Sequence, residues 1–324
     1  MKTPRRILIS PLDWGLGHAS RIIPLINRYL EQGDNVIIAG SGLSLNLLKK
    51  QFPTLESIEI PSFKMKYSAG KSQVWAVAKA FPRLIYYSIR EHSALKRIVK
   101  EKNIDFIISD NRFGLYHKTV PSAYITHQLL IKLPKGWAWL EPFVAFVHRC
   151  IINRFTECWV PDFEDMSESL AGELSHPTKK PRNVRYIGIL SRFSKRCTPY
   201  GRENITTNLA LAILSGAEPQ RTIFENELFI SLQNNPSENI ILVQGKIEAE
   251  QKVSKVGKVT VYNFMSSEEL QEYILKADEI ICRSGYSSIM DLHALGKLLN
   301  ATLIPTPGQT EQEYLAKYIS NHIK

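Results

Sequence analysis

Short apolar segments alternate with longer helical patterns along this chain, and that alternation constrains the fold more than any other feature. The first half contains five predicted strands, at residues 6–10, 35–39, 56–60, 104–109 and 122–126. Helical patterns over 18–31, 43–51 and 73–101 lie between them, the last bent or interrupted at Pro82. Buried strands that alternate with helices form a parallel sheet with helices on both faces. The sequence therefore predicts an α/β protein.

A polar stretch separates this half from a second one. Residues 163–182 contain Pro177 and Pro181, which is typical of a linker. Predicted strands then resume at 184–187, 209–214, 239–244, 258–262, 279–282 and 302–304. A length of 324 residues also suits two domains. We predict Rossmann-like domains over 1–165 and 183–324, joined by a linker region at 166–182, with parallel sheets that face a central cleft.

The composition is that of a globular protein. Hydrophobic residues make up 44% of the chain, and no apolar run approaches the roughly 20 residues of a membrane-spanning helix. The apolar segment near the N-terminus is too short for a signal peptide. The four cysteines do not cluster with one another or with histidine; they are Cys150, Cys158, Cys197 and Cys282. We therefore expect no disulfide framework, no zinc site and a cytoplasmic location.

The positive charge is concentrated in the first half. Residues 1–182 hold 26 Lys and Arg against 16 Asp and Glu, whereas residues 183–324 hold 15 of each, so the whole net charge of +10 lies before residue 183. This asymmetry favours an anionic partner for the first half: a membrane surface, a phosphate-bearing substrate or a nucleic acid. The alternative is that the positive charge of the first half only keeps the protein soluble.

A glycine-rich turn follows the first predicted strand. Gly15 and Gly17 allow a tight turn and a close approach to a ligand, and Arg21 follows three residues after His18. His18 falls at the start of a helix, where free N–H groups and the helix dipole favour an anion. His18 is therefore a candidate general base or phosphate ligand, and its alternative role is to cap the helix.

Three further motifs follow predicted strands of the second half. Ser215 and Gly216 form a turn whose shape suits phosphate, although an ordinary strand-to-helix turn has the same pattern. The next motif comprises Arg283, Ser284, Gly285 and Asp291. Its turn leads into a helix whose carboxylate, Asp291, suits a ribose diol. The alternative is that the serine caps the helix and the aspartate is solvated. The last motif offers amides and carboxylates for sugar hydroxyls, at Gln309, Gln312 and Glu313.

Together these motifs resemble glycosyltransferase family 28, the MurG-like enzymes. The resemblance is carried by GxGHxxR near the N-terminus and by RSG…D and IPTPGQTEQEY near the C-terminus, and it covers most of the chain. It implies the GT-B fold, in which the N-terminal domain takes the acceptor and the C-terminal domain binds a nucleotide-sugar, usually UDP-linked. It also implies an inverting transfer of the sugar to an acceptor hydroxyl.

The resemblance further implies how the donor is bound. Arg192 would contact the diphosphate, backbone groups of Phe264 and Met265 would read the uracil, and Asp291 would hold the ribose. Gln312 and Glu313 would contact the sugar. This chain departs from the family in having Asp at 291, Glu at 313 and SGAEPQ at 215–220. The complete predicted donor site is Arg192, Ser215, Gly216, Phe264, Met265, Arg283, Ser284, Gly285, Asp291, Gln309, Gln312 and Glu313.

We expect no metal and no cofactor, with the UDP-sugar as co-substrate, because the chain has no DxD motif for a divalent ion. Arg192 and helix N-termini would instead stabilise the leaving diphosphate. His18 is the first candidate for the catalytic base and Asp13 the second. The predicted acceptor site comprises Gly15, Gly17, Asp110, Asn111 and His127; for the last three, local hydrogen bonding in loops is an equal alternative.

Two segments rich in aromatic and basic residues favour a lipid-linked acceptor. They span 74–102 and 137–154. Such a pattern suits helices that lie on anionic lipid, which would make the protein peripheral on the inner membrane face. The alternative is that their apolar stripes belong to the domain core.

Two other functions remain open. A PseG-like hydrolase of UDP-sugars would share the GxGHxxR turn and would release free sugar without an acceptor. A non-catalytic basic protein that binds nucleic acid belongs to another class. The chain matches no nucleic-acid-binding motif, so we do not expect nucleic acid as a partner.

Overall fold

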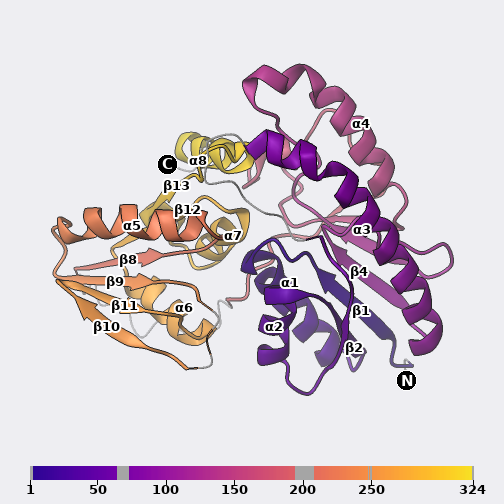
Figure 1. Ribbon diagram of the computed structural model, residues 1–324, viewed down its shortest axis with the longest axis horizontal. Coiled ribbons are helices and arrows are strands. Elements are labelled where there is room, and N and C mark those ends of the chain that lie inside the picture. Colours follow the sequence, from indigo (N-terminus) through magenta and orange to yellow (C-terminus); the bar gives the residue numbers. More distant parts are fainter. Residues whose placement is uncertain (1–2, 64–72, 194–207, 247, 249, 323–324) are drawn as a thin grey trace. The chain divides into compact units, whose positions relative to one another are not determined.

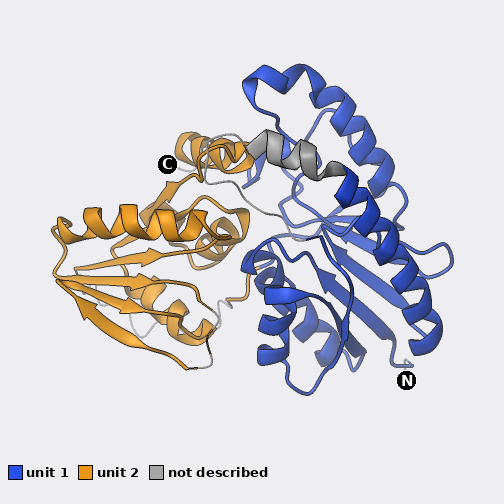
Figure 2. Cartoon of the chain, in the orientation of Figure 1, with its two compact units in different colours: residues 1–66, 72–190 blue, residues 67–71, 191–324 orange. Residues whose placement is uncertain are grey.

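The computed structural model describes residues 3–63, 73–193, 208–246, 248 and 250–322. These residues form two compact units (Figure 2). The first unit consists of the described residues up to Leu190, and the second begins at Ser191. Each unit is built on a single sheet with helices on both faces, as the alternating sequence pattern predicts.

A seven-stranded parallel sheet forms the centre of the first unit (Figure 1). Its strands are β1 (Arg6–Pro11), β2 (Asn35–Gly40), β3 (Glu56–Glu59), β4 (Phe106–Asp110), β5 (Ser122–Ile125), β6 (Glu157–Val160) and β7 (Val184–Tyr186). They lie in the order β3-β2-β1-β4-β5-β6-β7, so the direction of winding reverses between β1 and β4. In open α/β sheets, ligands bind at such a reversal, beyond the carboxyl ends of the two strands.

Helices cover both faces of this sheet. They are α1 (Leu16–Glu31), α2 (Gly42–Gln51), α3 (Gln73–Lys102) and α4 (Glu141–Ile152), with short 3-10 helices η1 (Lys135–Leu140) and η2 (Gly172–Leu174). In Figure 1, α1 and α2 lie on one side and α3 on the other. Leu8 of β1 packs in one buried cluster with Leu95 and Ile98 of α3. Because both faces are covered, the central strands are apolar at successive positions.

The second unit contains a six-stranded sheet. Its strands are β8 (Leu209–Ile213), β9 (Asn239–Val243), β10 (Val253–Val256), β11 (Val259–Tyr262), β12 (Glu279–Arg283) and β13 (Ala301–Ile304). They lie in the order β10-β11-β9-β8-β12-β13, and all neighbours are parallel except the edge pair β10–β11. Here the winding reverses between β8 and β12.

The helices of the second unit follow its parallel strands. They are α5 (Gln220–Gln233), α6 (Ser267–Lys276), α7 (Tyr286–Ala294), the 3-10 helix η3 (Leu298–Asn300) and α8 (Thr310–His322). Figure 1 shows α5 and α6 on opposite sides of the sheet. Phe224, Leu228 and Leu232 recur at helical spacing on α5 and pack against the sheet. The turns before α5 and α7 therefore open at the same sheet edge, beside the reversal.

The boundary between the units differs from the predicted one. The strand at 184–186 does not open the second domain but completes the first sheet beside β6, and the division falls between Leu190 and Ser191. The predicted linker region at 166–182 belongs to the first unit, where Leu170 and Leu174 are buried. Buried Asp162 organises this segment by accepting hydrogen bonds from the Leu170 backbone and the Ser175 hydroxyl. Polar anchoring of this kind leaves no apolar periodicity, so the segment has the sequence pattern of a linker.

Candidate active site

His18 and Asp110 meet at the reversal point of the first sheet. Asp110 ends β4 in register with Pro11 at the end of β1, and His18 lies in the first turn of α1. Nδ1 of His18 is 3.0 Å from Oδ1 of Asp110. The Asp110 side chain is fully buried, whereas that of His18 keeps 20% of its surface exposed. The buried carboxylate of Asp110 thus orients the partly exposed imidazole of His18 through Nδ1. This arrangement suits general-base catalysis.

Arg21 binds the same carboxylate. It follows His18 by three residues, so both side chains project from one face of α1. Its Nε donates to Oδ2 of Asp110 at 2.7 Å, and one terminal nitrogen contacts Oδ1. Burial raises the pKa of Asp110, but its interactions with Arg21 and then His18 outweigh burial and lower the pKa to about 2. Asp110 is therefore ionised at neutral pH.

Asp110, His127 and Asn111 were predicted to bind the acceptor, and the structure engages each of them with other side chains of the first unit. Asp110 has no exposed surface, and His127, 4% exposed, lies with its Nδ1 3.5 Å from a terminal nitrogen of Arg21. Asn111 adopts a left-handed turn with φ 54° and accepts a hydrogen bond from the Tyr124 hydroxyl at 3.1 Å. Asp110 and His127 therefore lie in the layer behind His18.

The glycine turn leaves open space before α1. Gly15 is the N-cap residue, its φ is 137°, and apart from its chain neighbours no described residue has an atom within 4 Å of where a Cβ would be. Gly17 follows in the first turn of the helix. The predicted close approach of a ligand to this turn is therefore sterically available.

Asp13, the second candidate base, is engaged at the start of α2. Its Oδ1 accepts a hydrogen bond from the backbone N–H of Ser44 at 3.0 Å, as a helix-capping carboxylate does. A Cβ at Gly42 would lie only 2.0 Å from Oδ2 of Asp13, so this approach requires glycine. The geometry gives Asp13 a structural role and leaves His18 as the stronger candidate.

In the second unit, Arg192 and Asp291 come together with Ser191. The Ser191 hydroxyl donates to Oδ1 of Asp291 at 2.6 Å, and Nε of Arg192 lies 3.6 Å from Oδ2. Burial raises the pKa of Asp291, while Arg192 and the Ser191 hydrogen bond oppose that rise. Sequence reasoning named Arg192 and Asp291 but missed Ser191; its position beside Arg192 was the available signal.

The turn before α7 has the open geometry expected of a ligand-binding helix terminus. Gly285 is its N-cap residue. Among the described residues, no side chain caps the helix there, and a Cβ at Gly285 would meet no atom within 4 Å apart from those of its chain neighbours. The preceding Ser284 is fully buried, and its hydroxyl donates to the backbone oxygen of Gln312 at 2.8 Å. Ser284 therefore anchors the neighbouring 305–313 segment.

The predicted sugar-binding side chains also shape that segment. Oε1 of Gln312 accepts from the backbone N–H of Thr306 at 2.8 Å, and Oε1 of Glu313 accepts from that of Gly308 at 3.0 Å. Gln309 lies half-buried in the same turn. These hydrogen bonds fix the loop and leave the amide nitrogen of Gln312 as its remaining donor group.

Arg283 lies inside the second unit rather than at its surface. It is 3% exposed, one terminal nitrogen donates to the Pro305 carbonyl at 2.8 Å, and the guanidinium stacks 3.6 Å from the centre of the Phe224 ring. Burial lowers its pKa. These contacts tie β12 to α5, which is a structural role.

The turn at Ser215 and Gly216 is followed by a carboxylate at the N-terminus of α5. Glu218 accepts hydrogen bonds from the Thr222 hydroxyl at 2.7 Å and from Nε of Arg221 at 2.8 Å. Because a carboxylate repels phosphate, the position of Glu218 disfavours the predicted binding of phosphate at the N-terminus of α5. The turn before α7 has no such acidic neighbour capping it.

The predicted uracil-reading segment is also partly engaged. The Phe264 N–H donates to Oδ1 of Asn263 at 2.9 Å, and its carbonyl accepts from the Gln251 amide at 3.0 Å. Both side chains at 264 and 265 are half-buried. The Phe264 N–H and carbonyl therefore already make hydrogen bonds within the unit.

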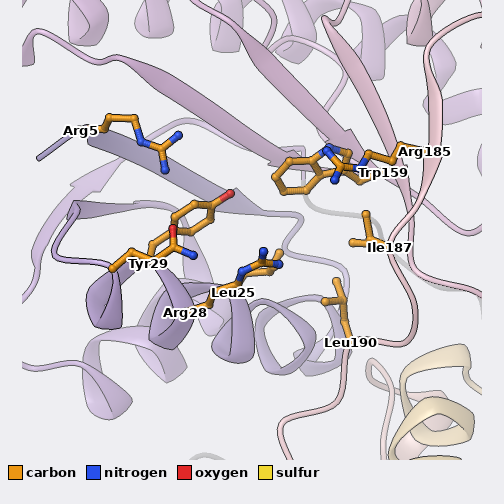
Figure 3. Close-up of a pocket in the computed structure, with 9 residues that line it drawn as sticks. Arg5, Leu25, Arg28, Tyr29, Trp159, Arg185, Ile187 and Leu190 are labelled. Atoms are coloured by element: carbon orange, nitrogen blue, oxygen red, sulfur yellow. The ribbon is translucent and has the colours of Figure 1, made fainter. Parts of the chain in front are cut away.

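A separate pocket of about 210 Å³ lies at the C-terminal half of α1 (Figure 3). Its lining comprises Arg5, Leu25, Arg28, Tyr29, Gln32, Trp159, Arg185, Ile187 and Leu190. It contains none of the predicted site residues, and His18 is at the opposite end of the same helix. Within the described part of the chain, no group of three His, Cys, Asp or Glu side chains could hold a metal ion.

Comparison with known proteins agrees with this architecture. Residues 213–324 match the glycosyltransferase family 28 C-terminal domain. A relative from Methanosarcina acetivorans, named an uncharacterized glycosyltransferase, is 24% identical over 95% of this chain and 81% of its own length.

Two solved structures with the same fold illustrate the class. UGT89C1 of Arabidopsis thaliana, complexed with UDP-L-rhamnose, has a TM-score of 0.61 at 15% identity, covering 99% of this chain and 83% of its own. MurG of Acinetobacter baumannii has a TM-score of 0.52 at 14% identity, covering 98% and 84%. The chain is a glycosyltransferase with the GT-B fold. Residues 213–324 of its second unit match the C-terminal domain of glycosyltransferase family 28.

Proposed function

We propose that this glycosyltransferase moves a sugar from a UDP-linked donor to an acceptor hydroxyl, with inversion and with His18 as the base. The observation that carries the proposal is the 3.0 Å contact between His18 and buried Asp110 at the reversal point of the first sheet. A fixed, partly exposed imidazole at a ligand-binding sheet edge is what proton abstraction from a hydroxyl requires.

The tautomer of His18 follows from its partner. Ionised Asp110 accepts a hydrogen bond, so Nδ1 of His18 carries the proton and Nε2 is left as the acceptor. In the transfer step, Nε2 takes the hydroxyl proton as the acceptor oxygen bonds to the anomeric carbon. The bond from that carbon to the diphosphate oxygen breaks at the same time, and UDP leaves with the electron pair.

Donor binding is assigned to the second unit. Arg192, the N-terminus of α7 at Gly285 and the Asp291 carboxylate lie at or near the reversal between β8 and β12. A guanidinium and helix N–H groups suit a diphosphate, and a carboxylate suits ribose hydroxyls. In the same unit, Glu218 disfavours phosphate at α5, which directs the donor to the α7 side.

A lipid-linked acceptor and an anionic membrane surface fit the exposed side chains of the first unit. Trp139 is 74% exposed, and Phe143, Phe146, Tyr86 and Ile89 are also exposed, although most large apolar groups are buried. Arg149 stacks on Phe146 and Arg90 on Tyr86, so cations border the apolar groups. This pattern suits an interfacial face, and it disfavours the alternative that these stripes belong to the core. The side chains of Trp75, Lys79 and Phe81, which belong to the same predicted segment, lie outside the described residues.

None of the described helices is long and apolar enough to cross a membrane. Attachment through these side chains would therefore be peripheral, and we propose the inner membrane face as its location.

The test is a transfer assay with UDP-sugars, with and without a membrane lipid extract as acceptor source. UDP release and a labelled lipid product are expected only when the acceptor is present. His18→Gln should lower turnover by roughly 10²–10⁴-fold while leaving the Kd for UDP unchanged. His117→Gln, a loop histidine of the same unit, is the matched control. Free sugar released without any acceptor would instead establish the hydrolase.

A further inference from the structure

We infer that Arg21 is a positioning residue that keeps His18 competent as a base by neutralising the carboxylate that orients it. The inference rests on the proposed role of His18. Arg21 does not face the reacting atoms: its side chain is 2% exposed and lies behind the imidazole, on Asp110.

The geometry gives Asp110 two partners with different tasks. Arg21 approaches with two nitrogens, one on each carboxylate oxygen, which is the bidentate arrangement that fixes a carboxylate most firmly. His18 approaches only Oδ1, through Nδ1. The guanidinium therefore sets the orientation of the carboxylate, and the carboxylate in turn sets the orientation of the imidazole.

The charges of Asp110 and Arg21 determine which protonation state of His18 the buried cluster favours. Asp110 and Arg21 together carry no net charge, so a neutral His18 leaves the buried cluster neutral. Without Arg21, the fully buried carboxylate would have His18 as its counter-ion. A buried charge is costly unless it is paired, so the imidazole would retain its proton and could not accept another.

The other charged groups around Asp110 do not replace Arg21. Arg112, two residues after Asp110, forms an ion pair with Glu91 at 3.0 Å. Tyr124 stays neutral because burial raises its pKa well above its ordinary value. His127 lies against the guanidinium of Arg21, at 3.5 Å from a terminal nitrogen. Arg21 is thus the cation that compensates Asp110.

Two substitutions separate the charge of Arg21 from its size. Arg21→Met removes the charge, and we expect kcat at pH 7 to fall by roughly 10²-fold or more, with partial recovery as the pH is raised. Arg21→Lys keeps the charge but loses the bidentate geometry, so we expect a smaller loss with a pH profile close to that of the unchanged enzyme. Arg28→Met, an exposed arginine of the same helix, is the control.

The measurements are kcat and KM for transfer between pH 6 and 9.5, with melting temperatures to confirm folding. A reduced kcat of Arg21→Met with an unshifted pH profile would overturn the inference, because a purely structural role predicts that result. If Arg21→Met does not fold, Arg21→Lys and the nitrogen chemical shifts of His18 in the unchanged protein still decide. A neutral ring protonated at Nδ1 at pH 7 supports the inference, and a doubly protonated ring contradicts it.

The same spectra keep this inference distinct from the proposed function. An unchanged protein that shows the neutral Nδ1-protonated ring but transfers no sugar would refute the proposed reaction and leave the charge balance intact. Active transfer together with a doubly protonated resting ring would refute the role of Arg21 alone.

Discussion

Replacing Asp110 with asparagine tests the buried charge cluster through stability rather than activity. The pKa of Asp110 falls from 3.8 to about 2 on folding, which corresponds to about 2 kcal/mol of the free energy of unfolding at neutral pH. Asparagine also leaves the guanidinium of Arg21 buried without its carboxylate. Breaking one side of a buried ion pair costs roughly 3–5 kcal/mol, so we expect a total loss of that size.

The contribution of Asp110 to the free energy of unfolding changes with pH in a defined direction. Because folding lowers the pKa of Asp110, the stabilisation is fully present above its unfolded value near 4 and is lost as the pH falls toward 2. Differential scanning calorimetry at several pH values is the assay. For a unit of this size, a loss of about 3 kcal/mol lowers the melting temperature by roughly 6–12 °C. The difference in melting temperature between Asp110→Asn and the unchanged protein should be constant above about pH 5. This difference should become smaller below about pH 4.

A matched variant isolates the effect of burial. Asp105 is an exposed aspartate just before β4, and its carboxylate accepts a hydrogen bond from the Arg6 backbone at 2.7 Å. Asp105→Asn should lower the melting temperature far less than Asp110→Asn. Equal melting temperatures for the two variants, or a difference that does not narrow in acid, would refute the assignment of Asp110 as a stabilising ionised group.

Three further predictions concern ligands. UDP should raise the melting temperature more than ADP, GDP or CMP, and equal shifts for all four would argue against a uridine-specific site. Asp291→Asn should weaken UDP binding by roughly 1–3 kcal/mol in calorimetric titrations without lowering the melting temperature, because burial already raises the pKa of Asp291 and favours its neutral form. The unchanged protein should pellet with anionic vesicles at low salt and less with neutral ones, and changing Arg83, Arg90 and Arg97 to Glu should abolish pelleting. No pelleting of the unchanged protein would indicate a soluble acceptor.

Most of the fold could be predicted because the central strands are buried on both faces and are therefore apolar throughout. Two short edge or near-edge strands were missed. β10 spans only Val253–Val256, all four residues exposed, and pairs with β11 through a turn at Gly257. β6 spans only Glu157–Val160. Because β10 has no buried residue, its pairing depends on the neighbouring strand rather than on an apolar pattern of its own.

The sequence named the residues of the candidate site but not the contacts between them. His18 was predicted at the start of a helix and Asp110 after a strand, yet they are 92 positions apart and meet only because β4 lies beside β1. The spacing of Arg21 places it on the face of His18, but it does not identify Asp110 as the shared partner. Similarly, Glu218 has the sequence position of an ordinary helix-starting residue, and the sequence does not show that its carboxylate accepts hydrogen bonds from the N–H and hydroxyl of Thr222 in α5.

The two carboxylates at the sheet reversals differ in electrostatic state, and that difference suits different tasks. Asp110 is paired with Arg21 and hydrogen-bonded to His18, so its ionised form is stable before any substrate binds. Asp291 has a raised pKa because Ser191 and Arg192, the latter 3.6 Å away, do not offset its burial. A carboxylate in that state gains from further hydrogen-bond donors, and the two hydroxyls of a ribose supply them. Under the proposed function, the first unit would thus hold a preorganised carboxylate that orients the base, whereas the second would hold a binding group that a ligand completes.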